Sequence, residues 1–171
     1  MLFRSKIGAI ASMIHPLSPA PQINMYLKLS NSQWALTLDA FFKVFNEGMQ
    51  GTAVKKLILA TVPDYLSGII KPLFKLTKGR KIPPVPPEAN VLWYMNLLNG
   101  NHPPVDTVKT NPNDTSIILY SGGTTGVPKG IELTNLNMIS EGMMVSAWGK
   151  MNNRHSVLAI LPIFQIGRAH V

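Results

Sequence analysis

The chain has 171 residues, a net charge of +8, no cysteine, 46% hydrophobic residues and 14% charged residues. These values exclude disorder along most of the chain, a disulfide framework and a thiolate metal site. The basic balance leaves three classes of partner open, namely nucleic acid, a membrane surface and an anionic ligand.

The first third of the chain alternates between strand and helix patterns. Ile23, Tyr26 and Leu27 have the spacing of one helix face. Asp39 is placed to cap a second helix. The predicted elements are a buried strand reached within residues 6–15, a helix over residues 21–29, a strand over residues 34–38, a helix over residues 39–48 and a strand over residues 57–61. This alternation predicts an α/β fold with a parallel sheet, in which layered sheets are flanked by helices.

A basic and amphipathic stretch follows over residues 65–78, and residues 81–87 hold four prolines that predict an extended connector. The cations of this region are Lys71, Lys75, Lys78, Arg80 and Lys81, with no acid among them. They form either a solvated basic face or a contact with an anionic surface, such as lipid headgroups or the phosphates of a cofactor. Nucleic acid is not expected, because no aromatic residues are interleaved with the cations.

The second half again combines helices and strands. Its predicted elements are a helix over residues 91–98, a loop over residues 101–113, a strand over residues 116–120, a glycine-rich loop, a short extended piece over residues 131–133, a helix from about residue 135 to residue 147 and a buried strand over residues 157–161. Thr134 is placed to cap the last helix. No stretch approaches the roughly 18 apolar residues of a transmembrane helix, and Gly8 and Ser12 interrupt the N-terminal apolar run, so a cytoplasmic location is expected, with or without membrane association.

The glycine-rich loop directly follows a predicted strand. It reads Ser121, Gly122, Gly123, Thr124, Thr125, Gly126, Val127, Pro128, Lys129 and Gly130. Glycines allow the backbone N–H groups to converge on an anion, the hydroxyls add donors and the lysine adds charge. Pro128 before the lysine and Gly130 after it exclude a Walker A loop, and the adjacent glycines exclude a dinucleotide fingerprint. The loop therefore predicts a phosphate site, with a ligand-free Gly/Thr turn as the alternative.

Residues 118–129 resemble the signature of the adenylate-forming superfamily, which includes acyl- and aryl-CoA synthetases, adenylation domains and firefly luciferase. The resemblance implies that the loop closes over the β- and γ-phosphates of ATP, held by Ser121, Thr124, Thr125 and Lys129. Mg²⁺ would arrive with ATP, and a carboxylic acid and CoA would be the other substrates. No protein ligand set for a metal is expected, since no His, Asp and Glu cluster has ligand spacing.

Residues 6–16, 21–30 and 156–164 resemble further elements of the same family, so residues 1–165 are expected to form an incomplete part of its N-terminal domain. The sequence near residues 14–19 and 75–81 is most similar to that of bacterial fatty-acyl-CoA synthetases. The resemblance implies an ATP-dependent acyl-CoA ligase that activates a fatty acid through an acyl-adenylate. An adenylation domain that loads a carrier protein and a non-catalytic nucleotide-binding module are the alternatives.

The chain departs from the family pattern at two places. Asn135 and Gln165 each stand where the family has histidine. The hexapeptide Ile166–Val171 matches nothing in the family, and a common sequencing-adapter string encodes it, so residues 166–171 are expected to be non-native. Genomic DNA that continues to encode these residues would contradict this. Both ends of the chain are expected to be incomplete, and the 171-residue chain alone is expected to have no ligase activity.

Overall fold

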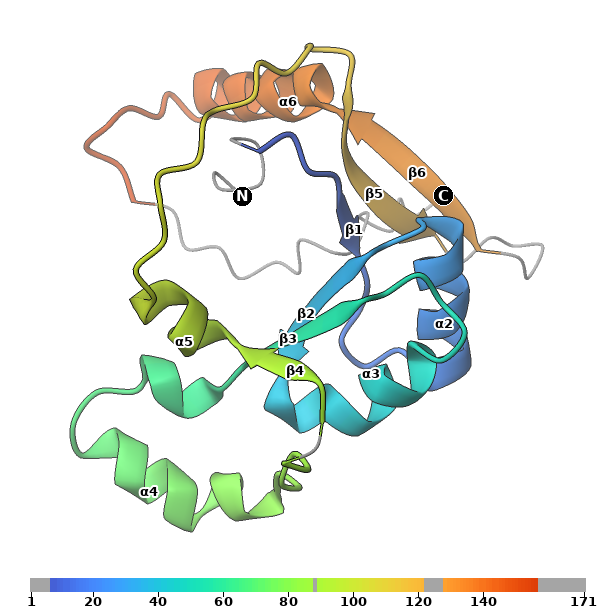
Figure 1. Ribbon diagram of the computed structural model, residues 1–171. Helices are drawn as coiled ribbons and strands as arrows, with labels where there is room; N and C mark the ends of the chain where they lie inside the picture. The colour runs from blue at the N-terminus through green and yellow to red at the C-terminus, as the bar shows by residue number, and fades with distance from the viewer. Residues whose placement is uncertain (1–6, 88, 122–127, 157–171) are drawn as a thin grey trace, which may run out of the picture. The chain divides into compact units, whose positions relative to one another are not determined.

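The computed structural model describes residues 7–87, 89–121 and 128–156 of a chain that divides into two compact units (Figure 1). Unit 1 comprises residues 1–15 and 104–171, and unit 2 comprises residues 16–103. Each unit has its own three-stranded sheet. The strand predicted over residues 157–161 and the hexapeptide of residues 166–171 lie outside the described residues.

The sheet of unit 2 is parallel, as the alternation of elements predicted. Its strands are β2 (Trp34–Leu38), β3 (Lys56–Ala60) and β4 (Val91–Trp93), with β3 in the middle. The helices of unit 2 are α2 (Ala20–Leu29), η1 (Asp39–Phe41), α3 (Phe42–Gly48), η2 (Val62–Tyr65), α4 (Ile70–Leu76), η3 (Lys78–Lys81) and α5 (Tyr94–Asn99), where η denotes a 3₁₀-helix. The predicted strand over residues 34–38 has the observed bounds, and the helix predicted over residues 21–29 begins one residue earlier.

The core of unit 2 is built on the middle strand. Leu57 and Leu59 of β3 are 1% and 0% exposed, and Ala35 of β2 lies beside them. Alternate residues of β2 are buried, which is the period expected of a strand with one covered face. The partly buried side chains packed against this cluster are Phe42, Met49, Val54, Val85 and Val91. Strand pairing and apolar burial therefore stabilise the same three strands.

Helices α2 and α3 approach closely at Gly48. A methyl group added there would lie 2.8 Å from Cγ2 and 2.9 Å from Cβ of Ile23, a fully buried residue of α2. The side-chain amide of Asn24 donates to the carbonyls of Gly48 and Gln50 at 2.9 and 2.7 Å. It thus satisfies carbonyl groups that the end of α3 leaves without a partner inside the helix. The glycine permits the contact, and the asparagine fixes it.

We expect Gly48→Ala to destabilise the chain by about 1–3 kcal/mol, because overpacking outweighs the better helix propensity of alanine. Gly142→Ala is the matched control, since Gly142 lies inside a helix and a methyl group added there meets nothing within 4 Å. That substitution should stabilise by about 1 kcal/mol. Urea unfolding of both variants checks the pair, and equal effects of the two would contradict the close approach at Gly48.

Two local expectations for unit 2 are wrong. Residues 91–98 begin as β4 and become helical only at Tyr94, because Val91, Leu92 and Trp93 pair with β3. A short apolar run fits either structure, and here the neighbouring strand decides. Asp39 does not cap α3: it opens η1, and its Oδ1 accepts from the N–H of Ala40 at 2.8 Å.

Burial raises the pKa of Asp39 above its ordinary value, the N–H of Ala40 acts in the opposite direction, and the nearby charge of Asp64 raises it further. A raised folded-state pKa means that the ionised carboxylate opposes folding, so this cost disappears as the pH falls through that pKa. Asp39→Asn keeps the acceptor oxygen and removes the charge. It should stabilise the chain at neutral pH by roughly a few tenths of a kcal/mol, since solvent screens the partly exposed group.

The measurement for Asp39→Asn is urea unfolding at neutral pH and again below the ordinary Asp pKa of 3.8. The parent and the variant should differ at neutral pH and converge at the acid pH. A variant that is less stable than the parent at neutral pH would show that the carboxylate charge favours folding, contrary to the expected sign.

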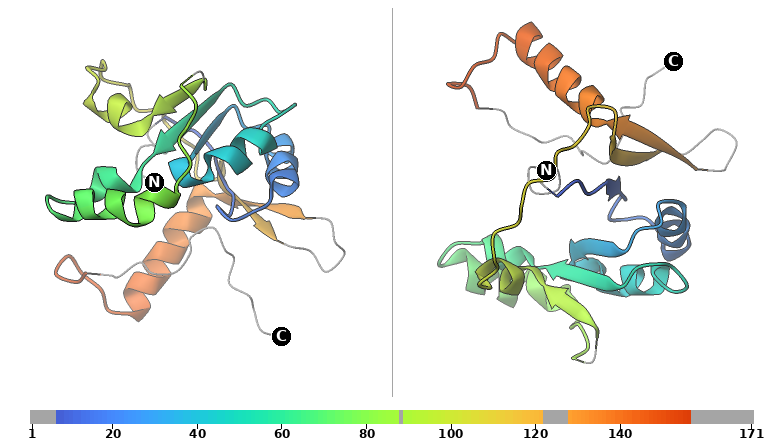
Figure 2. Two further views of the ribbon diagram at one scale, coloured as in Figure 1. Left: turned by 90° about the horizontal axis from the view of Figure 1, so that it is seen from below. Right: turned by 45° about the horizontal axis from the view of Figure 1, so that its top comes forward.

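The sheet of unit 1 is mixed. β5 (Thr115–Ser121) lies between β1 (Ala11–Met13), to which it is parallel, and β6 (Lys129–Thr134), to which it is antiparallel. The expectation of a parallel sheet therefore fails for β6, because the connection between β5 and β6 is too short for a crossover. The short extended piece predicted over residues 131–133 is this longer strand. α6 (Asn135–Trp148) follows β6 directly (Figure 2).

Candidate functional site

The loop predicted to bind phosphate connects β5 to β6. Ser121 and Lys129 are register partners at the end of this antiparallel pair, so the structure brings the first and last predicted site residues together. Figures 1 and 2 both show the two strands side by side up to this end. The other predicted site residues lie outside the described residues, namely Gly122, Gly123, Thr124, Thr125 and Gly126. The described part of the site is therefore the mouth of the loop.

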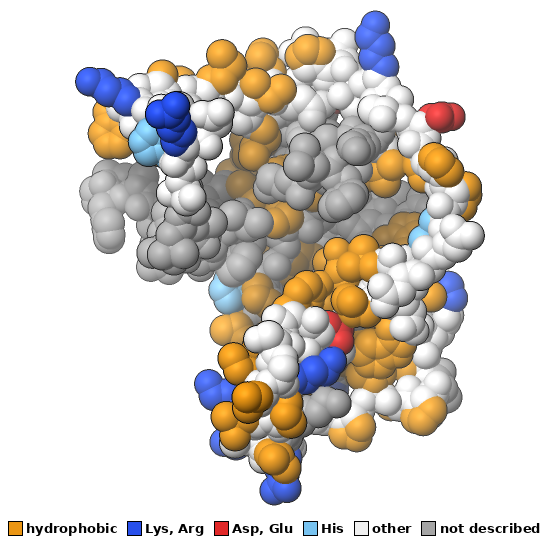
Figure 3. All heavy atoms as spheres, turned by 90° about the vertical axis from the view of Figure 1, so that its left-hand side faces the viewer, with side chains coloured by type: hydrophobic (Ala, Val, Ile, Leu, Met, Phe, Trp, Pro, Cys, Tyr) orange, Lys and Arg blue, Asp and Glu red, His pale blue; other side chains and the backbone are white. Residues whose placement is uncertain are grey.

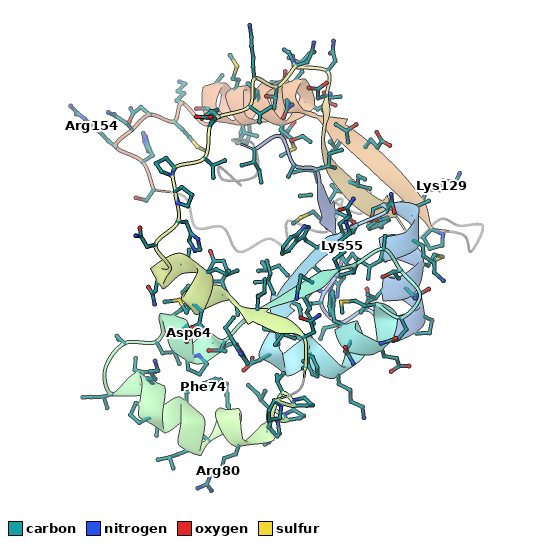
Figure 4. All side chains as sticks on the ribbon, in the orientation of Figure 1. Lys55, Asp64, Phe74, Arg80, Lys129 and Arg154 are labelled. Atoms are coloured by element: carbon teal, nitrogen blue, oxygen red, sulfur yellow. The ribbon has the colours of Figure 1, made fainter. Side chains whose placement is uncertain are left out.

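The charge of Lys129 lies at this mouth. Its side chain is exposed at the start of β6, as Figure 4 shows, and Ser121 opposite is half-buried. Glu132 is three residues further along β6 and therefore on the other face of the strand. Its Oε2 accepts a hydrogen bond from the hydroxyl of Thr115 at 2.7 Å. Glu132 is thus engaged by Thr115 and does not neutralise Lys129.

The strand that carries the loop is anchored on both sides. Besides β6, β5 pairs with β1 over Ala11–Met13, and Ile117 and Leu119 are 2% and 8% exposed. The hydroxyls of Ser12 and Tyr120 are 2.7 Å apart. This hydrogen bond joins residues 108 positions apart, immediately before the loop begins. No sequence pattern indicates this pair, and its effect is to hold the strand that carries the loop.

The far end of β6 is held by a capping box. The hydroxyl of Thr134 accepts from the N–H of Asn137 at 3.2 Å, and Asn137 Oδ1 accepts from the N–H of Thr134 at 2.9 Å. The cap predicted at Thr134 is therefore confirmed. The side-chain amide of Asn135 donates to the carbonyl of Asn111 at 3.1 Å. The asparagine found where the resemblance predicts a histidine thus makes a hydrogen bond to the preceding loop.

A pocket of about 110 Å³ lies in unit 1 at the opposite end of β5 from the glycine-rich loop. Gly8, Val108, Asp114 and Asn135 are among its lining residues. Because β5 has seven residues, about 20 Å separates its two ends. The pocket is therefore distant from the mouth of the loop.

The described ranges also bear on metal binding, on reactive histidines and on membrane-spanning helices. Residues 7–87, 89–121 and 128–156 contain no group of three or more His, Cys, Asp and Glu side chains that could hold a metal ion. His102 and His155 are exposed, and each bonds locally, to the carbonyl of Leu97 and to Asn152. In the same part of the chain, no helix is long and apolar enough to span a membrane.

The family model of the AMP-binding enzyme matches residues 4–169 and therefore includes β5, the loop and β6. The chain belongs to the AMP-binding enzyme family. The resemblance noted from the loop is thus confirmed.

Similar curated proteins of this family are CoA ligases. The chain is 27% identical over 164 residues to a long-chain-fatty-acid–CoA ligase of Bacillus subtilis, covering 93% of the chain and 29% of that protein. It is 24% identical over 171 residues to 4-coumarate–CoA ligase CCL1 of Humulus lupulus, covering 96% of the chain and 27% of that protein. The chain thus spans less than a third of the length of the relatives that it matches.

Solved structures of the family have the same fold. A long-chain-fatty-acid-CoA ligase from Archaeoglobus fulgidus aligns with a TM-score of 0.60 at 20% identity, over 85% of this chain and 24% of that one. The anthranilate CoA ligase AuaEII aligns with a TM-score of 0.56 at 18% identity, over 76% of this chain and 21% of that one. The α/β fold is therefore that of part of an adenylate-forming enzyme, as the sequence predicted.

Proposed function

We propose that this chain is part of an AMP-forming acyl-CoA ligase and contributes the loop that binds the phosphates of ATP. The observation that carries the proposal is the family match over residues 4–169, which includes a hairpin with Ser121 and Lys129 paired at its mouth. The proposed reaction has two steps. A carboxylate oxygen attacks the α-phosphorus of ATP and pyrophosphate leaves, and then the CoA thiol attacks the acyl-adenylate carbonyl, loses its proton and releases AMP.

In the first step, negative charge builds up on the bridging oxygen as pyrophosphate separates. We propose that Lys129 offsets this charge and that the hydroxyls of Ser121, Thr124 and Thr125 donate to the phosphate oxygens. Gly122, Gly123 and Gly126 would let the backbone N–H groups approach the same oxygens. These residues position the phosphates and stabilise charge, and no side chain of the loop needs to form a covalent bond.

We propose that Mg²⁺ enters this reaction bound to ATP. Hydroxyls, N–H groups and an ammonium suit an anion, whereas Mg²⁺ prefers oxygen ligands such as carboxylates, water and phosphates. These residue types support a site in which the ion is bound through the phosphates of ATP and not by side chains of the loop. The ion would supply further charge neutralisation when it is bound.

We propose a fatty acid as the carboxylic substrate. The likeness to a fatty-acid–CoA ligase supports this substrate. The likeness to a 4-coumarate–CoA ligase makes 4-coumarate the competing substrate to test. The test is product formation by the complete enzyme with ATP, Mg²⁺, CoA and either palmitate or 4-coumarate. Palmitoyl-CoA and AMP are the expected products. Formation of product with 4-coumarate but not with palmitate would change the proposed substrate. Transfer of the acyl group to a carrier protein and never to CoA would contradict the proposed acyl-CoA ligase activity.

We propose that the enzyme is cytoplasmic and contacts the membrane peripherally through residues 71–81. The support is the charge of the segment, since residues 66–87 contain five cations and no acid. The cytoplasmic leaflet is anionic and attracts such segments. A water-insoluble acyl substrate would also be met at that surface.

A further inference from the structure

The basic segment of unit 2 also exposes large apolar side chains. They are Tyr65 at 64%, Ile69 at 87%, Ile70 at 54%, Leu73 at 59% and Leu76 at 60% exposed. A single exposed leucine is ordinary on a protein surface, but a contiguous apolar patch marks an interaction site. Five such residues within twelve positions need an explanation that charge alone does not give.

The helix arranges three of these side chains on one side. Ile69, Leu73 and Leu76 are spaced by four and three residues, so they share a face of α4, whereas Lys71 lies on another face. Phe74 is half-buried, and the position of a methyl group at Gly79 would be 3.5 Å from its ring and 3.0 Å from its carbonyl oxygen. η3 therefore folds back against α4 on the Phe74 side. It does not cover the face formed by Ile69, Leu73 and Leu76.

Cations border this apolar face. Lys71, Lys78, Arg80 and Lys81 are all exposed. In Figure 3, apolar and basic side chains are interspersed at the lower end, over α4 and η3. Figure 4 shows Arg80 and Phe74 on opposite sides of the segment, with Arg80 directed away from the rest of unit 2. The surface is therefore both apolar and strongly positive.

We propose that α4 and η3 dock on an anionic lipid bilayer, with Ile69, Leu73 and Leu76 inserted among the lipid chains and the cations at the phosphate level. A solvated face would explain the cations but not the leucines, and the phosphates of CoA would likewise leave the leucines unused. An anionic bilayer binds both sets of side chains at once. The inference rests on the membrane contact proposed above and is independent of the ligase reaction.

The experiment measures partition of the 171-residue chain onto vesicles of equal parts phosphatidylglycerol and phosphatidylcholine, against phosphatidylcholine alone. Binding should require the anionic lipid. Leu73→Ser combined with Leu76→Ser should weaken it by about a hundredfold, tenfold for each buried leucine. Lys78→Gln combined with Lys81→Gln should weaken it by about fivefold for each charge. Ile139→Ser on α6 is the matched control, since Ile139 is 60% exposed like Leu76, and should not change binding.

A second variant reports insertion without loss of binding. Leu73→Trp should gain a blue-shifted emission component on addition of anionic vesicles and none with soluble glycerol phosphate. If the double serine variant binds as well as the parent while the glutamine variant does not, the contact is electrostatic only, which overturns insertion and leaves the membrane contact. If the parent chain does not bind anionic vesicles, both the insertion of α4 and the membrane contact are wrong. If Ile139→Ser weakens binding as much as the double serine variant does, α4 is not the docking site.

Discussion

Replacing Lys129 with alanine in the complete enzyme should lower the rate of carboxylate-dependent ATP–pyrophosphate exchange by about 10²–10³-fold, the usual cost of removing one group that stabilises transition-state charge. Lys129 is exposed at the mouth of the loop, and Glu132 is engaged by Thr115 on the other face of β6. The charge of Lys129 is therefore not neutralised by Glu132, and we expect it to be available to the phosphates. Most of the loss should appear in kcat, because charge on the leaving pyrophosphate develops only during the reaction.

Lys109→Ala is the matched control for charge, since Lys109 is also exposed and belongs to the same unit but lies outside the loop. It should leave the exchange rate unchanged. Thermal unfolding of the two variants should be indistinguishable, because exposed substitutions cost little. Equal losses of activity in both variants would show that Lys129 acts only through the overall positive charge of the protein.

Replacing Leu59 with alanine should destabilise the chain by about 2–5 kcal/mol, which is the cost of deleting a buried leucine and leaving a cavity. Leu59 is fully buried on the middle strand of the parallel sheet, next to Leu57 and Ala35. The neighbouring strands pair with β3 from both sides and restrict its movement. The cavity therefore cannot collapse easily, and the cost should lie toward the upper part of the range.

Leu36→Ala removes the same atoms from β2, but Leu36 is 60% exposed. It should cost less than about 0.5 kcal/mol. Urea unfolding of the two leucine variants at one pH gives the comparison. A Leu59→Ala variant as stable as Leu36→Ala would mean that the β3 cluster is not the core of unit 2.

The sequence predicted those parts of the fold whose information is local. Trp34–Leu38 combines strand propensity with turn residues on both sides, and α2 has a clear helical period. β4 was mistaken for helix because only pairing with β3, about thirty residues earlier in the chain, makes Val91 extended. The Asp39 cap failed for a local reason, since the carboxylate bonds to the adjacent N–H and a 3₁₀ turn precedes the helix.

The candidate site shows the same division. The loop was recognisable because glycines, hydroxyls and a lysine are contiguous in the chain, and Thr134 was recognisable as a cap because its partner is three residues away. The hydrogen bond between Ser12 and Tyr120 was not predictable, because it depends on β1 pairing with β5 across most of the chain. The antiparallel direction of β6 follows from the shortness of the loop and could have been inferred from it.

The measurement that tests the central proposal most directly is ATP–pyrophosphate exchange by the complete enzyme, with and without a fatty acid. The proposed function predicts exchange that requires the acid, proceeds without CoA and is nearly abolished by Lys129→Ala. Tight ATP binding with no acid-dependent exchange would contradict a ligase and indicate a nucleotide-binding module.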